Sequence, residues 1–143
     1  MFEEEPDIIV DWNAFSLARS QMGASFVRML DYFKQDGDTA VERIESAMQR
    51  QDCVGLVSPA DRLGSDAREF GAVVLADLAE EIEVAARRAI ENHLFPDDLI
   101  PEVAKLRPLY RRTIDELERA ANPLAQRRTG PRVTPPVMGN TSG

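Results

Sequence analysis

The sequence predicts an all-α protein: an antiparallel up-down four-helix bundle with an extra short N-terminal helix. Apolar residues recur at steps of three and four along the chain, which is the spacing of one helix face. There is no alternating run of β-branched residues, and no Asn-Gly or Asp-Gly hairpin lies between such runs. The connections between successive helical patterns are short, which favours antiparallel neighbours.

Length and charge exclude several classes of partner. The 143 residues suffice for one domain with an apolar core. A net charge of -8 argues against nucleic acid, which is bound mainly through clustered Lys and Arg, and against an anionic membrane surface. No apolar run approaches the roughly 20 residues that cross a bilayer, and the acidic start is unlike a signal peptide. With a single cysteine, Cys53, a cytoplasmic location is expected.

The N-terminal part divides into an acidic leader, residues 1–10, and the beginning of the helical domain, residues 11–122. The apolar end of the leader, residues 8–10, is expected to cover one edge of the bundle. Asp11 is a plausible N-cap for a helix over residues 12–22, which Gly23 ends. The residues of this helix expected to point inward are Phe15 and either Leu17 or Ala18.

The next two patterns predict two helices separated by a turn. Phe26, Val27, Leu30 and Phe33 define the first, and residues 35–38, with the sequence QDGD, end it with turn chemistry. Thr39 and Glu42 then form a capping box that opens a helix to about Arg50. Its predicted inner face consists of Val41, Ile44, Ala47 and Met48.

The stretch SPADRLGSDAREFGA, residues 58–72, is the most informative part of the chain. Its first residues, Ser58, Pro59 and Asp61, fill the positions of a helix start, although a kinked join to a preceding turn capped by Asp52 is favoured. Gly71 supplies a left-handed stop. The predicted core face is Ala60, Leu63, Ala67 and Phe70. Asp61 lies off that face and is expected to be wet or half-wet.

Two further helices complete the predicted bundle. Leu75, Leu78, Ile82, Ala85 and Ala89 recur at steps of three and four and predict a helix to about Asn92. The last helix has Pro101 in its first turn and Pro108 in its middle, where a kink is expected, and ends at residues 122–123. Its predicted inner stripe is Leu99, Val103, Leu106, Tyr110, Ile114, Leu117 and Ala121. Residues 123–143 have the composition of a flexible tail.

The central stretch resembles the motif of histidine-containing phosphotransfer (HPt) domains of bacterial two-component phosphorelays, A-H-x-L-K-G-S-A-x-x-x-G-A. The positions that agree are Ala60, Leu63, Ala67, Gly71 and Ala72. The same register puts Asp61 where the family has its phospho-accepting His. Gly64, Ser65 and Asp66 stand in the family's Lys, first Gly and Ser positions, and the only histidine is His93. The match therefore concerns the packing side of the helix and not its chemistry.

This resemblance implies a signalling module that docks a response-regulator receiver or a histidine kinase. The implied docking surface comprises Asp61, Arg62, Gly64, Ser65 and Arg68. A carboxylate cannot form the phosphoramidate of a phosphotransfer His, so no phosphotransfer is expected in this form. Aspartyl phosphate chemistry is not expected either, because Asp66 and Glu69 do not converge with Asp61 on one magnesium ion. No cofactor or metal motif occurs.

Three alternatives stay open at this point. The chain could be an active phosphotransfer protein whose His was substituted in this copy, or a structural or dimerising helix bundle, and its oligomeric state is open. Asp61 could also be a plain first-turn acid that the helix dipole favours, which is worth about 0.3–1 kcal/mol.

Overall fold

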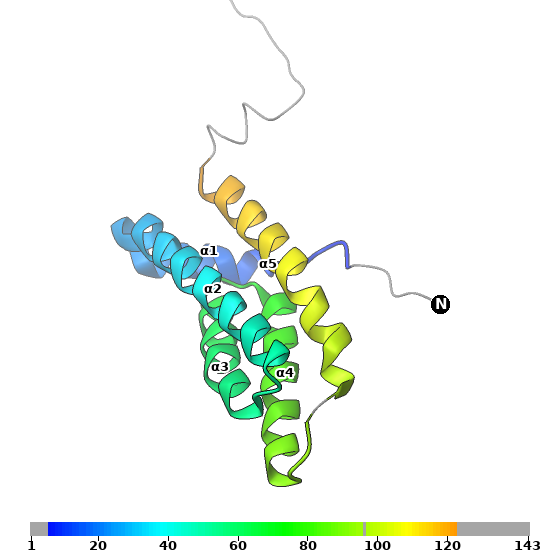
Figure 1. Cartoon of the computed structure of the whole chain (residues 1–143). Helices are drawn as coiled ribbons and strands as arrows, with labels where there is room; N and C mark the ends of the chain where they lie inside the picture. The colour runs from blue at the N-terminus through cyan, green and yellow to red at the C-terminus, as the bar shows by residue number, and fades with distance from the viewer. Residues whose placement is uncertain (1–5, 96, 123–143) are drawn as a thin grey trace, which may run out of the picture. The chain divides into compact units, whose positions relative to one another are not determined.

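The computed structural model describes residues 6–95 and 97–122, and within these ranges every regular element is helical (Figure 1). The elements in chain order are α1 (Trp12–Met22), η1 (Gly23–Ser25), α2 (Phe26–Gln49), α3 (Cys53–Glu69), α4 (Val73–Glu91), η2 (Asp97–Leu99) and α5 (Ile100–Ala121). The predicted all-α class is confirmed. The described part of the chain divides into two compact units, with the division between Thr113 and Ile114 inside α5.

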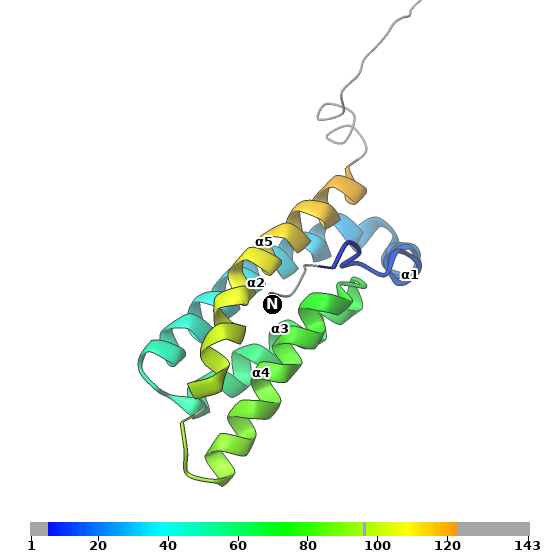
Figure 2. The same ribbon diagram turned by 90° about the vertical axis from the view of Figure 1, so that its right-hand side faces the viewer.

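Within the first unit, α2, α3, α4 and the part of α5 up to Thr113 alternate in direction, which confirms the predicted up-down bundle (Figures 1 and 2). The short α1 lies across one end of it. None of the helices in the described ranges is long and apolar enough to span a membrane. The predicted tail, residues 123–143, lies outside the described residues.

The leader and α1 are attached to the end of α3 through Asp11. Its carboxylate accepts hydrogen bonds from the backbone N–H groups of Asn13 and Ala14, as predicted for an N-cap, and its own N–H donates to the carbonyl of Gly71 at 2.8 Å. Gly71 has φ +78°, so it is the predicted left-handed stop. A Cβ there would lie 2.7 Å from the Asp11 carbonyl oxygen, so this contact requires glycine for a second reason.

The predicted break at residues 35–38 is wrong, because α2 runs without interruption through them. Gly37 is buried inside the helix and faces the ring of Tyr110, so closely that a Cβ at this position would lie only 2.5 Å from Tyr110 Cε1. The Tyr110 hydroxyl lies 2.7 Å from the Lys34 carbonyl oxygen and 2.9 Å from Asp38 Oδ1. This glycine makes room for an aromatic ring and does not form a turn. Of the predicted inner residues of α2, Val27 is exposed.

The central stretch belongs to one longer helix, as the favoured join to the preceding turn predicted. Asp52 caps α3 by accepting from the Gly55 N–H at 3.0 Å, and Leu56 is fully buried in its first turns. The alternative start at Ser58 is wrong, because this earlier cap and apolar anchor carry the helix through Pro59. Four residues, Ala60, Leu63, Ala67 and Phe70, are buried as predicted.

A connected set of aromatic rings forms the core near α1. Phe15 of α1 packs edge-on against Phe26 of α2, and Phe26 packs against Phe70 after α3, with ring centroids 5.4 and 5.8 Å apart. Phe70 also stacks on Phe33 at 5.3 Å. This cluster holds the end of α3 against α2 and thereby fixes the rotation of α3 about its axis.

Candidate functional site

Asp61 lies on the exposed side of α3, as the sequence predicted, while Ala60 and Leu63 beside it are buried. It is more than two turns from the beginning of the helix at Cys53. The helix dipole acts on charges within the first turn, so it does not account for an acid at this position. The explanation of Asp61 as a first-turn acid is therefore wrong, because the helix starts earlier than the sequence indicated.

Ser65 and Arg62 share the exposed face of α3 with Asp61, but Gly64 does not. Gly64 is buried against α4: a Cβ built on it would lie 3.5 Å from both the Ala76 carbonyl oxygen and the Ala79 Cβ. The prediction of Gly64 as an exposed docking residue is thus wrong. It lies only about 60° around the helix from Asp61, on the side that packs against Ala76 and Ala79 of α4, where a small residue allows α3 and α4 to pack closely.

Arg68 is exposed at the edge of this face, next to α4. Its Nη2 atom lies 3.0 Å from Asp77 Oδ1 and 3.0 Å from Glu80 Oε1, both on α4. Arg68, which the sequence predicted as a docking residue, is therefore paired within the chain, and it links the two helices.

Arg62 lies between acids of two helices. The guanidinium is 3.9 Å from Asp36 Oδ2 of α2 and 4.0 Å from Asp66 Oδ2 of α3. Burial raises the pKa of the Asp66 carboxyl above its usual 3.8; Arg62 acts in the opposite direction, and Glu69 and Asp36 raise it further. The cation on the α3 face thus makes two ion pairs, both longer than a hydrogen bond.

A hollow of about 240 Å³ borders this face between α2 and α3. Its polar lining consists of Asp36, Thr39, Arg43, Ser58 and Arg62. Sequence reasoning missed Thr39 and Arg43 as site residues. Their spacing from Asp36, three and seven residues, places all three on one exposed face of α2, but only the packing of α2 against α3 brings that face next to Arg62.

His93 lies in the turn after α4, with φ +57°, and its side chain is exposed. It is not part of the α3 face. In the described part of the chain, no three His, Cys, Asp or Glu side chains come together as a group that could hold a metal ion.

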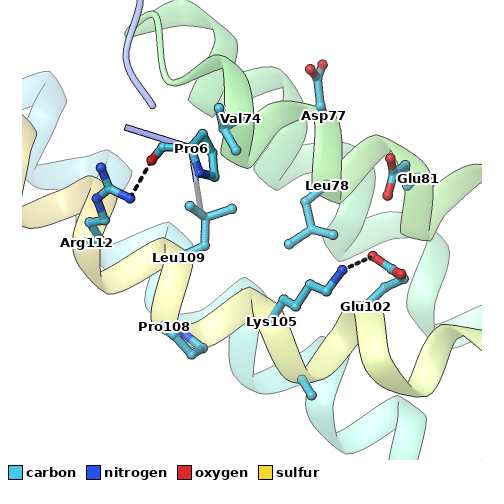
Figure 3. A pocket seen from close by; sticks show the side chains of 11 residues that line it. Pro6, Val74, Asp77, Leu78, Glu81, Glu102, Lys105, Pro108, Leu109 and Arg112 are labelled. Carbon is cyan, nitrogen blue, oxygen red and sulfur yellow. Dashed lines mark hydrogen bonds and ion pairs between the residues drawn. The ribbon is translucent and has the colours of Figure 1, made fainter. Parts of the chain in front are cut away.

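A larger groove, of about 650 Å³, lies between α4 and the first part of α5 (Figure 3). Leu78 and Leu109 form part of its apolar lining. Both cations of its lining are engaged: Lys105 pairs with Glu102 at 3.5 Å, and Arg112 donates to the Pro6 carbonyl at 2.9 Å. The Arg112 contact attaches the leader to α5, whereas the Lys105 pair lies within α5.

Comparison with known proteins gives two findings. The Hpt domain family model matches residues 28–123. The crystal structure of histidine-containing phosphotransfer protein B (HptB) from Pseudomonas aeruginosa PAO1 is similar with a TM-score of 0.69 and 19% sequence identity, over 80% of this chain and 96% of that one. A comparison with curated proteins found no match. The family match covers most of α2 and all of α3, α4 and α5, so it includes the whole face around Asp61.

Proposed function

Since this chain belongs to the Hpt domain family of two-component phosphotransfer modules, we propose that it docks a response-regulator receiver or a histidine kinase through the exposed face of α3, without transferring phosphate. The proposed docking face consists of Asp61, Arg62 and Ser65, with Arg68 at its α4 edge. Gly64 lies on the buried side of α3, where its lack of a side chain lets α4 approach α3.

The observation that carries this proposal is the position of Asp61. The motif positions that pack in the family, such as Leu63 and Ala67, are fully buried here, so α3 keeps the rotation that the motif implies. That rotation turns Asp61, in the phospho-accepting position, toward solvent. Because Asp61 lies beyond the first turn of α3, the helix dipole does not explain it, which supports a role on the surface.

The chemistry of the face supports docking rather than transfer. A neutral imidazole is nucleophilic near pH 7 and forms a labile phosphoramidate, and a carboxylate does neither. The family's Lys position is occupied by Gly64, so no cation stands there to assist phosphoryl oxygens. A partner held on this face would be sequestered or scaffolded instead of being dephosphorylated by transfer.

The docking prediction is tested by enlarging a side chain on the face. Ser65→Arg places a long side chain one turn after Asp61, and because Ser65 is exposed the fold should tolerate it. Binding to a panel of purified receiver domains and kinases is measured by titration calorimetry. We expect at least about tenfold weaker binding, which corresponds to about 1.4 kcal/mol.

The matched control is Ser16→Arg, which makes the same change at an exposed serine on α1 and should leave the affinity unchanged. Equal affinities for the Ser65→Arg variant and the unsubstituted chain would contradict docking on this face. Acid-labile phosphate appearing on the unsubstituted chain after incubation with a phosphorylated receiver would contradict the absence of transfer and point to His93.

A further inference from the structure

Two guanidinium groups from neighbouring helices line the hollow between α2 and α3. Arg43 comes from α2 and Arg62 from α3, and the hydroxyls of Thr39 and Ser58 line the same space. The one acid of the lining is Asp36. The hollow thus gathers two cations and two neutral hydrogen-bonding groups in a chain whose net charge is -8. We refer to it as the arginine pocket.

Neither of these two arginines makes a hydrogen bond within the described part of the chain. Among the described residues, Arg43 has no hydrogen-bond or ion-pair partner. The distances from Arg62 to its two acids, 3.9 and 4.0 Å, exceed the 2.7–3.2 Å of an N–H···O hydrogen bond. Arg107 shows the contrast, because it holds Glu45 with two bonds of 2.7 and 3.0 Å. Within the described residues, Arg43 is therefore unpartnered, and Arg62 is held only by two long ion pairs that a stronger acceptor can displace.

We propose that the arginine pocket binds the phosphoryl group of a phosphorylated receiver, so that this chain prefers the phosphorylated form of its partner; the inference rests on the docking function proposed above. A phosphoryl group presents several oxygens that accept charge-assisted hydrogen bonds, and the planar guanidinium fork matches them. On α3, Arg62 directly follows Asp61, and Ser58 lies one turn before Arg62. The arginine pocket therefore borders the docking face. Asp36 competes with the phosphoryl group for Arg62.

The first experiment uses inorganic phosphate and needs no partner. The full chain, labelled with nitrogen-15, is titrated while the Nε–Hε signals of its arginines are followed by NMR. We expect saturable shifts for Arg43 and Arg62 with a dissociation constant on the order of 1–10 mM. Arg43→Gln should abolish them. Asp36→Asn should strengthen binding several-fold, because it removes the competing carboxylate. Arg111→Gln, at an exposed arginine of α5, is the matched control and should change nothing.

The second experiment compares a receiver domain with and without beryllium trifluoride on its acceptor aspartate, a stable mimic of the phosphoryl group. We expect about tenfold tighter binding of the loaded receiver, with the preference lost in Arg43→Gln and kept in Arg111→Gln. Equal affinity for the two forms, or a preference that survives Arg43→Gln, would overturn the inference and leave the docking function standing. No binding of either form would overturn the docking function as well. Absence of phosphate-induced NMR shifts at Arg43 and Arg62 would overturn the proposal that this pocket binds a phosphoryl group.

Discussion

At the scale of single residues, two glycines of the bundle are buried inside helices but differ in the space available for a side chain. A Cβ on Gly37 would lie 2.5 Å from the ring of Tyr110, whereas one on Gly64 would lie at the ordinary contact distance of 3.5 Å from α4. Glycine inside a helix is less stable than alanine by roughly 0.5–1 kcal/mol unless close packing requires it. The same substitution should therefore have opposite effects at the two positions.

We predict that Gly37→Ala destabilises the protein by about 1–3 kcal/mol, because Tyr110 must move away from its bonds to Lys34 and Asp38. Gly64→Ala should be neutral or stabilising by up to about 1 kcal/mol. Urea unfolding followed by circular dichroism measures both. If Gly64→Ala lowered the free energy of unfolding as much as Gly37→Ala does, the α3–α4 contact would be tighter than the structure shows.

The half-buried Asp66 makes stability depend on pH. Its pKa is raised in the folded chain, so the folded state binds this proton more strongly than the unfolded state does. The free energy of unfolding therefore falls as the pH rises from below 3.8 through the raised pKa, and the loss is complete at neutral pH.

We predict that Asp66→Asn raises the free energy of unfolding at pH 7 by about 0.5 kcal/mol, the scale of a partly exposed surface change. The gain should shrink below pH 3.8, where both states already hold the proton. Denaturant titrations at several pH values test this, with Asp61→Asn as a control for removing one charge from the same helix. A gain that is independent of pH would assign the effect to packing.

At the scale of helices, two arginines connect pairs of elements in different ways. Arg68 links α3 to α4 through two acids whose side chains are 66% and 62% exposed. Arg107 links α5 to α2 through a two-bond contact with Glu45, and both side chains are about one-third exposed. Exposed pairs contribute little and are screened by salt, whereas a bidentate, partly buried pair is stronger.

We predict that Arg68→Gln costs less than about 1 kcal/mol, and that this cost disappears in 1 M salt. Arg107→Gln should cost about 1–3 kcal/mol at either salt concentration, because it leaves the partly buried Glu45 without its partner. Thermal unfolding at low and high salt distinguishes the two. An equally salt-sensitive cost for both would show that the Arg107 pair is no better shielded than the Arg68 pair.

At the scale of the whole molecule, the Hpt family match concerns the bundle, whereas the proposed docking depends on side chains exposed on α3. The burial of Leu63 and Ala67 concerns the bundle, while the proposed phospho-accepting position concerns one exposed side chain, Asp61. The two are physically separable, because an exposed side chain in the middle of a helix contributes little to folding.

We predict that Asp61→His changes the free energy of unfolding by no more than about 0.5 kcal/mol, since Asp and His have similar helix propensities and the site is exposed. Incubation with a phosphorylated receiver should then yield slow formation of acid-labile phosphate on this variant, with Gly64 in place of the family's Lys limiting the rate. Asp61→Asn is the control. If Asp61→His neither binds nor accepts phosphate from any receiver, and Ser65→Arg has no effect on binding, a structural or dimerising bundle becomes the better account.

The sequence alone determined the features whose causes lie within a turn or two of the chain. The period of three and four places Leu75, Leu78 and Ile82 in the core, and the Asp11 cap and the Gly71 stop act on adjacent backbone groups. The exposure of Asp61 follows from the same periodicity. These signals are local, so reading residues in order is sufficient to find them.

Only the tertiary structure decided the features whose causes lie on another helix. Gly37 signals a turn in sequence, but the ring of Tyr110 makes it a helix interior residue. Packing against α4 removes Gly64 from the surface and gives Arg68 its two acids. Arg43 joins Arg62 only because α2 and α3 lie side by side. Such partners are chosen by the packing of whole helices, and local sequence does not encode which distant residue will be opposite.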